Sequence, residues 1–432
     1  MSLTPSGVGS TGVDHRDPEQ RLRSFFDRGT LRLLAARDDS GVLYARGRVD
    51  GTPAIAFATD ATRLCGALGL AGCRHIVAAV DVAVRERVPV AGLWHSGGAR
   101  LAEGVVALDG VGQVLAAMVR ASGRVPQLSV VLGPAAGGAA YGPALTDIVI
   151  TSRSGRIFVT GPETASDVGT AGIAHVSTED DTSALSEARA LVVLLGHQGR
   201  LSPDDVPPGG RTGRSLDRLM PAEANRVYDV KPVVTALLDE PGVELHGRWA
   251  PNVVTTLGRF AGRTVGVVAN NPLRLGGCLD AAGAEKAARF VRMCDSLGVP
   301  LIVLVDVPGY LPGLGHEPDG VVRRGAQLLH AFADAVVPRV TLVTRKAYGW
   351  AYLAMNSRSL GATAVFAWPT AEVAVMGAGA AVNFLHRKRL AATPPDQRDA
   401  LRERLVREQV EVAGGVRSAL ELGVVDDVIT PE

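Results

Sequence analysis

One Gly-rich turn occurs twice in this chain at a fixed spacing, and this repetition limits the possible fold more than any other feature. Gly137 in the first copy and Gly349 in the second lie 212 positions apart. Val-Pro pairs precede the apolar strands of both copies at nearly the same offset, namely Val88–Pro89, Val125–Pro126, Val299–Pro300 and Val337–Pro338. The repeat is too long for a solenoid, so the sequence predicts two copies of one α/β domain.

Each copy offers two Gly-rich turns between a buried strand and a helix. They are Ser96–Gly98 with Gly137–Gly138, and Pro308–Gly309 with Gly349–Trp350. Glycine lets a ligand approach the backbone, and the N–H groups at a helix N-terminus stabilise negative charge. Two such donors aimed at one point form an oxyanion hole for an enolate or a tetrahedral intermediate. The alternative is close strand–helix packing, which the repetition of both turns makes the weaker interpretation.

Composition indicates an ordinary intracellular α/β protein. Hydrophobic residues make up 47% of the chain, aromatic residues only 4%, and the formal net charge is +1, which provides no overall field to attract nucleic acid. The four cysteines form no CxxC pair, so we expect neither a disulfide framework nor a metal site. We expect no transmembrane helix and no signal peptide, and a cytoplasmic location.

The same patterns suggest domain boundaries. Residues 1–16 are polar and rich in Gly and Ser, which predicts a disordered lead. Residues 17–202 form the expected N-terminal domain and residues 253–432 the C-terminal one. Between them, residues 203–252 are rich in proline and polar residues, which predicts a linker with a short helix near Val230–Leu238.

Several stretches resemble one family, the carboxyltransferase (beta) subunits of biotin-dependent acyl-CoA carboxylases of the actinobacterial acetyl-/propionyl-CoA type. The resemblance covers roughly residues 17–428. The stretches that carry it are Trp94–Glu103, Ala136–Asp147, Arg156–Pro162, Ala269–Leu279, Glu285–Cys294, Val305–Pro312, Thr344–Tyr348 and Ala367–Gly377.

This resemblance implies two tandem crotonase-like domains in a hexamer, with each active site built between the first half of one subunit and the second half of another. It implies transfer of CO₂ from carboxybiotin to the α-carbon of acetyl- or propionyl-CoA. Biotin would be carried by a partner chain, a biotinylated alpha subunit with the biotin carboxylase, because no Met-Lys-Met attachment sequence occurs here. Coenzyme A enters as the thioester substrate, and no metal, nucleic acid or membrane is implied.

The resemblance also implies site residues. Gly137 and Gly138 would hold the thioester oxygen, and Gly349 with Trp350 the biotin urea oxygen. The remaining implied substrate-binding residues are Gly97, Gly98, Ala99, Arg100, Tyr141, Pro308, Gly309, Tyr310 and Leu353. Leu353 falls at the floor of the acyl pocket, where an apolar side chain resembles enzymes that accept both acetyl- and propionyl-CoA.

The chain departs from the family pattern in three places. Trp350 replaces a glycine, so its indole either narrows the biotin pocket or points into the core. Glu163–Ala171 is shorter than the corresponding segment of relatives, which usually borders the active site. Leu311–Gly320 carries Pro318 and Asp319 where relatives have an aromatic residue and its neighbour.

These departures leave other functions open. One is a biotin-independent malonyl- or methylmalonyl-CoA decarboxylase or another acyl-CoA enzyme of a specialised pathway, and another is a non-catalytic scaffold subunit. Several polar residues also have two interpretations, a ligand contact or a purely structural contact. They are His95 as a carbonyl-polarising group, Arg100, Arg153 and Arg156 as CoA phosphate ligands, Lys346 beside the second turn, and His316 with Glu317 as an acid/base pair.

Overall fold

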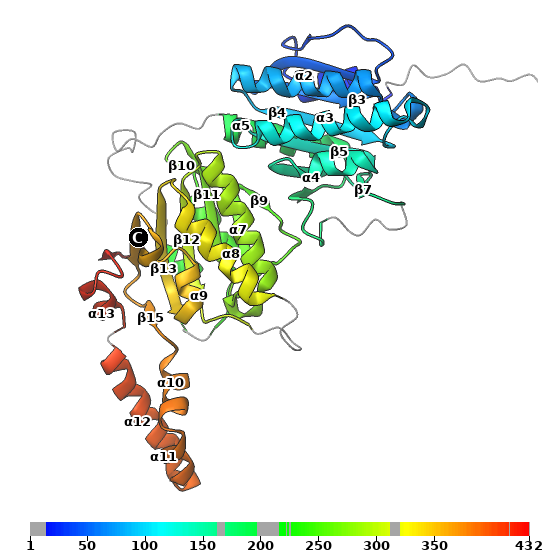
Figure 1. Cartoon of the computed structure of the whole chain (residues 1–432). Helices are drawn as coiled ribbons and strands as arrows, with labels where there is room; N and C mark the ends of the chain where they lie inside the picture. The colour runs from blue at the N-terminus through cyan, green and yellow to red at the C-terminus, as the bar shows by residue number, and fades with distance from the viewer. Residues whose placement is uncertain are drawn as a thin grey trace, which may run out of the picture. The chain divides into compact units, whose positions relative to one another are not determined.

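The computed structural model describes residues 14–161, 169–196, 216–221, 223, 226–311, 320–413 and 415–431. The chain divides into two compact units, Met1–Gly196 and His197–Glu432. Each unit contains one sheet with helices packed on it (Figure 1). Among the described residues, no helix is long and apolar enough to cross a membrane.

The first unit is built on a sheet of order β1-β2-β3-β4-β5-β6-β8, with β7 paired to β5. Strands β1 to β3 are antiparallel, and the pairs from β3–β4 onward are parallel. The strands are β1 (Arg32–Leu33), β2 (Val42–Val49), β3 (Thr52–Thr59), β4 (Val90–Ser96), β5 (Gln127–Ala136), β6 (Ile148–Thr151), β7 (Arg156–Phe158) and β8 (Val176–Ser177). The helices are α1 (Pro18–Phe25), α2 (Leu70–Glu86), α3 (Val105–Ala121), α4 (Gly138–Ala144) and α5 (Asp181–Gly196).

The second unit repeats this plan with the order β9-β10-β11-β12-β13-β14-β16, and β15 paired to β13. Its strands are β9 (Val243–Leu245), β10 (Val253–Phe260), β11 (Arg263–Asn270), β12 (Leu301–Val307), β13 (Arg339–Tyr348), β14 (Ala364–Ala367), β15 (Glu372–Ala374) and β16 (Asp427–Val428). Its helices are α6 (Lys231–Leu237), α7 (Ala281–Ser296), α8 (Val321–Asp334), α9 (Gly349–Ala354), α10 (Ala378–Leu385), α11 (Arg387–Ala392), α12 (Pro395–Ala413) and α13 (Gly415–Glu421).

The two sheets agree residue by residue, and this agreement confirms the duplication. Val90 pairs with Gln127 as Leu301 pairs with Arg339. Both sheets also contain the same irregularity. Between Trp94 and Ser96, one residue of β4 lies opposite three residues of β5, and between Val305 and Val307, one residue of β12 lies opposite three residues of β13. We use these registers below to compare equivalent positions of the two units.

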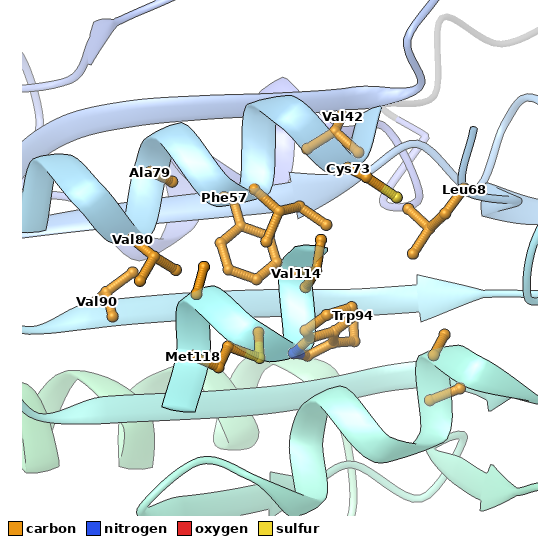
Figure 2. Packing of buried hydrophobic residues seen from close by; sticks show 14 of the residues in the cluster. Val42, Phe57, Leu68, Cys73, Ala79, Val80, Val90, Trp94, Val114 and Met118 are labelled. Carbon is orange, nitrogen blue, oxygen red and sulfur yellow. The ribbon is translucent and has the colours of Figure 1, made fainter. Parts of the chain in front are cut away.

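The core of the first unit lies between the sheet and the pair α2 and α3 (Figure 2). Trp94 packs edge-on against Phe57 with ring centroids 5.1 Å apart, and its indole N–H donates to Ser129 Oγ at 2.9 Å. Alternate residues of β4 therefore point into this core, because successive side chains of a strand face opposite sides. His95, the next residue, points to the other face of the sheet.

The local patterns in the sequence account for many element boundaries. Asp17 caps α1 through hydrogen bonds from the N–H groups of Glu19 and Gln20, with Pro18 in the first turn. The turn Asp50–Gly51 has φ values of 46° and 80° and joins β2 to β3. The expected linker differs from the structure, since β9 lies within residues 203–252 and pairs with β10 in the second sheet.

Candidate active site

The two Gly-rich turns of the first unit lie against each other at the carboxyl ends of β4 and β5. A Cβ on Gly98 would lie 3.3 Å from the carbonyl oxygen of Ala136. The parallel register of the two strands brings about this approach, because it places Ser96 beside Ala135. The structure therefore brings together the residues Gly97, Gly98, Gly137 and Gly138 that the sequence singled out.

Gly137 makes the turn into α4. Its backbone has φ 57° and ψ −128°, which favours glycine, and a Cβ there would meet nothing within 4 Å. The N–H of Gly137 donates to Phe158 O at 3.0 Å, so this donor is already used within the unit. Gly138 is the first residue of α4, where an N–H has no acceptor within the helix. The open space beside Gly137 thus adjoins the N–H of Gly138.

The first turn uses its own donors internally. Gly97 N–H donates to Cys65 O at 2.9 Å, and Gly98 N–H donates to Ser96 Oγ at 3.2 Å. Ala99 forms a bridge with Leu68. These contacts hold the turn in place. Because their N–H groups are already bonded within the unit, Gly97 and Gly98 allow a ligand to approach the backbone closely but offer it no free N–H donor.

Arg100 has a structural role in this chain. Its guanidinium donates to the carbonyl oxygens of Ala67 at 3.1 Å, Asp39 at 2.9 Å and Ser40 at 2.9 Å. It also pairs with Glu103 at 3.4 Å. Arg100 therefore fastens the first turn to two loops, and these bonds favour the structural contact over the phosphate ligand, the two interpretations that the sequence left open. Arg153 and Arg156 are exposed, as a phosphate contact requires, and Tyr141 on α4 is 51% exposed.

His95 lies away from α4. Trp94 packs under Gly142 of α4, whereas the His95 ring packs against Gly133 and its Nδ1 lies 3.3 Å from Nη2 of the buried Arg21 on α1. Burial, then the positive charges of Arg21 and Arg16, lower the pKa of His95 from 6.5 to about 4. The ring is therefore neutral at pH 7, and the structure favours a structural hydrogen bond over polarisation of a carbonyl.

This histidine makes the first unit sensitive to acid. Between pH 6.5 and 4 the unfolded chain binds the proton that folded His95 does not, so the free energy of unfolding falls as the pH falls through this window, by up to about 1.4 kcal/mol per pH unit. We expect His95→Asn, which keeps an acceptor for Arg21, to reduce that slope. Urea unfolding at pH 7, 6 and 5 measures it, and identical slopes for both proteins would contradict the assignment.

The second unit forms the corresponding pair of turns. Leu279 N–H donates to Gly309 O at 3.0 Å, and Tyr310 bridges to Leu279 as Ala99 does to Leu68. Gly349 repeats the φ of 57°, and a Cβ there would lie 2.8 Å from Val375 O. Pro308 and Gly309 follow directly after Val307, which is paired with Ala347, so the two turns again lie side by side.

Trp350 is the second residue of α9, at the position equivalent to Gly138. Its side chain is 80% exposed in this chain. The indole therefore does not point into the core, so the interpretation of the sequence that buried it there is wrong. Leu353, on the same helix, is half-buried. His316, Glu317 and most of Glu163–Ala171 lie outside the described residues.

A buried ion pair shapes these turns, although sequence reasoning did not single it out. Arg345 Nε lies 2.8 Å from Asp306 Oδ2, and Asp306 Oδ1 accepts the N–H of Lys346 at 3.2 Å. The guanidinium carbon of Arg345 lies 4.8 Å from the centre of the Tyr228 ring. Asp306 occupies the position of His95, which shows that each unit fills the irregularity between its central strands differently. Asp306 and Arg345 both fall in stretches that resemble the family, and this resemblance is the sequence signal that could have identified them.

No group of three or more His, Cys, Asp or Glu side chains that could hold a metal ion occurs in the described part of the chain. The donors that the two turns offer are backbone N–H groups at helix starts. Tyr310 is the other notable polar group, because burial raises the pKa of its hydroxyl to about 12 and no described residue hydrogen-bonds to it.

Comparison with known proteins identifies the family. The carboxyl transferase domain model matches residues 23–169 and 166–432. The chain is 55% identical to the biotin-dependent acetyl-/propionyl-coenzyme A carboxylase beta6 subunit of Mycobacterium tuberculosis, over 99% of this chain and 94% of that protein. It is 56% identical to the propionyl-CoA carboxylase beta chain of Rhodococcus erythropolis, over 96% and 91%.

Solved structures agree with this result. Transcarboxylase 12S, described as a hexamer assembly with methylmalonyl-coenzyme A and methylmalonic acid bound, matches with a TM-score of 0.87 and 35% identity over 96% of this chain and 86% of that one. The family resemblance and the two tandem crotonase-like domains expected from the sequence are confirmed. The chain belongs to the carboxyl transferase family.

Proposed function

We propose that this chain is the carboxyltransferase subunit of a biotin-dependent acyl-CoA carboxylase. It transfers the carboxyl group of carboxybiotin to the α-carbon of acetyl-CoA or propionyl-CoA, giving malonyl- or methylmalonyl-CoA. The observation that carries the proposal is the open space at Gly137, next to the Gly138 N–H, which has no acceptor within α4. The 55% identity to an acetyl-/propionyl-CoA carboxylase subunit supports the choice of substrates.

The first unit stabilises the developing enolate. When the α-carbon loses its proton, negative charge forms on the thioester oxygen, and Gly138 N–H with the N-terminus of α4 is placed to bind it. Gly137 supplies the turn and the room for the thioester. The N–CO₂ bond of carboxybiotin breaks, the new C–C bond forms, and the α-proton passes to the biotin nitrogen. No side-chain nucleophile is required.

The second unit is proposed to receive biotin from a biotinylated alpha subunit, and the assembly is proposed to be a hexamer, as transcarboxylase 12S is. Trp350 stands at the helix start that would bind the urea oxygen, and its exposed indole narrows that end of the pocket. Leu353 gives the acyl pocket an apolar floor. One methylene changes binding by about 1–3 kcal/mol, so we expect both acetyl- and propionyl-CoA to react.

The first test follows malonyl-CoA and methylmalonyl-CoA by chromatography, with and without added biotin. We expect acetyl- and propionyl-CoA to form only when biotin is present, which is the reverse carboxyl transfer. Formation without biotin would replace the proposal with a decarboxylase. No conversion in either case would favour the scaffold function.

Trp350→Gly gives a second test of the same site. Removing the indole widens the proposed biotin pocket, so we expect kcat/KM for free biotin to rise about tenfold or more, with KM for malonyl-CoA unchanged. Val375→Ala, which shortens another exposed apolar side chain of the second unit, serves as the control for a general change of surface. An unchanged kcat/KM for biotin in Trp350→Gly would place the indole outside the pocket.

A further inference from the structure

One face of the second sheet is covered less than the same face of the first. In the first unit, α5 packs on β3, β5 and β6, on the side away from α2 and α3. The side chains of β4, β5 and β6 that face this way are completely or almost completely buried. They are Ala91, Leu128, Val130, Ile148 and Ile150, each 0% or 1% exposed.

The equivalent side chains of the second unit are only half-buried. The registers of the two sheets match position for position, so the equivalents are known without superposition. They are Ile302, Val340, Leu342, Ala364 and Phe366. Helix α6 covers the β10–β11 side of this face, and Ile302 and Leu342 pack against the edge of its cluster. In the described part of the second unit, no helix contacts β13 and β14 from this side as extensively as α5 contacts β5 and β6. We call these five residues the open face.

A cavity of about 490 Å³ lies at one end of the open face. Thr344 and Thr370 line it, and they are the equivalents of Leu132 and Ser154. In the first unit, Ser154 Oγ lies 3.2 Å from Leu132 O and 3.2 Å from Asp181 Oδ1, the first residue of α5. The cavity therefore lies where the first turn of a helix placed like α5 would lie.

The lining of the cavity suits the start of such a helix. Lys346 lines it and is half-buried, and among the described residues its ammonium group has neither an ion-pair nor a hydrogen-bond partner. Acidic residues in a first turn are favourable for a helix and would pair with this lysine. Two further charged residues line it, Arg345, which is paired with Asp306, and Glu372, which accepts the hydroxyl of Tyr348. The rest of the wall is apolar, with Met220, Pro221, Trp368, Pro369 and Pro431.

We propose that the open face binds an amphipathic helix of another polypeptide chain, with chemistry like that of α5. Such a helix has an acidic first turn, as α5 has Asp181, and buries an inner face of small and branched apolar residues. In α5 these are Ala184, Leu185, Ala188, Leu191, Val192 and Leu195. The sequence of residues 197–215 contains three prolines and four glycines, a composition that does not match this chemistry.

The probe for this proposal is a fluorescent synthetic peptide of residues 178–196, added to the full chain in its native assembly and followed by fluorescence anisotropy. We expect saturable binding in about the micromolar range. Lys346→Glu is expected to weaken it about tenfold or more. A peptide with Asp180→Lys and Asp181→Lys should bind Lys346→Glu and not the original protein. Lys388→Glu, an exposed lysine on α11, is the matched charge control and should bind the original peptide normally.

Phe366→Ala tests the apolar part separately, because it removes contact area without changing charge. We expect it to weaken binding about tenfold while circular dichroism stays unchanged. The proposal would be overturned if the peptide does not bind, or if it binds equally to Lys346→Glu and to Phe366→Ala. The latter result would mean that the peptide replaces α5 in the first unit instead.

Discussion

Gly138→Pro is expected to lower kcat/KM for carboxyl transfer about 10²- to 10³-fold, the typical loss when one oxyanion donor is removed. Proline has no N–H, yet it suits the first position of a helix, so α4 should still form. The substitution therefore removes the proposed donor at small structural cost. Steady-state rates of malonyl-CoA decarboxylation in the presence of biotin measure the effect.

Gly138→Ala is the matched control. A Cβ at this position lies 3.0 Å from Cγ1 of Val111 on α3, and proline adds the same atom. Alanine keeps the N–H, so its kcat/KM should stay within about tenfold of the original protein, the allowance for a small shift of Val111. Equal losses in both variants would assign the effect to packing and remove Gly138 from the oxyanion hole.

Much of the fold could be predicted because its determinants are local or repeated. Asp17-Pro18 starts α1 through a cap that needs only neighbouring residues. Asp50-Gly51 supplies two residues suited to positive φ, and the hairpin follows. Gly137 and Gly349 share a φ of 57°, so the repeated glycines correspond to a repeated backbone conformation. Because the offset between the two copies is nearly constant, the strand order of one sheet predicts the strand order of the other.

The hydrogen bonding of the site could not be predicted in the same way. The N–H of Gly137 donates to the carbonyl oxygen of Phe158, and the guanidinium of Arg100 donates to the carbonyl oxygens of Asp39 and Ser40. These acceptors lie in segments that are distant in sequence. A motif shows which residue stands in a turn, but not which of its donors the surrounding chain already uses. The exposure of Trp350 likewise depends on what packs beside α9.

The duplication also reveals where the halves differ. His95 with Arg21 fills the irregularity of the first sheet, whereas Asp306 with Arg345 fills that of the second. An ion pair in one half and a neutral histidine in the other give the two turns different electrostatic surroundings, although their backbones agree. This difference suits a pair of sites that bind different partners, a thioester in one half and biotin in the other.

Lys286→Met is expected to lower the free energy of unfolding of the second unit by about 2–4 kcal/mol. Lys286 is 0% exposed, and its ammonium group donates to the carbonyl oxygens of His246 at 3.0 Å, Trp249 at 3.0 Å and Ala250 at 3.4 Å. These carbonyls belong to a turn between β9 and β10 in which His246 and Ala250 have φ values of 56° and 44°. Methionine fills much of the same volume but removes all three of these bonds, so that His246 O and Ala250 O keep only the N–H groups of Trp249 and Val253.

Urea unfolding followed by circular dichroism measures this loss, and Lys231→Met is the control. Lys231 lies in the same unit, but its side chain is 42% exposed and pairs with Glu244 at 2.8 Å. Exposed ion pairs contribute about 0–1 kcal/mol, so this variant should change the free energy of unfolding little. Similar losses in the two variants would show that Lys286 does not hold the turn.

The pH dependence of Lys286 provides an independent check. Burial lowers its pKa from 10.5 to about 8, with Glu244 acting in the opposite direction and Lys231 in the same direction as burial. Between pH 8 and 10.5 the unfolded chain therefore binds a proton that the folded chain has released, and this group makes the free energy of unfolding rise with pH across that window. The rise should disappear in Lys286→Met and remain in Lys231→Met. A rise of equal size in all three proteins would mean that a different group titrates.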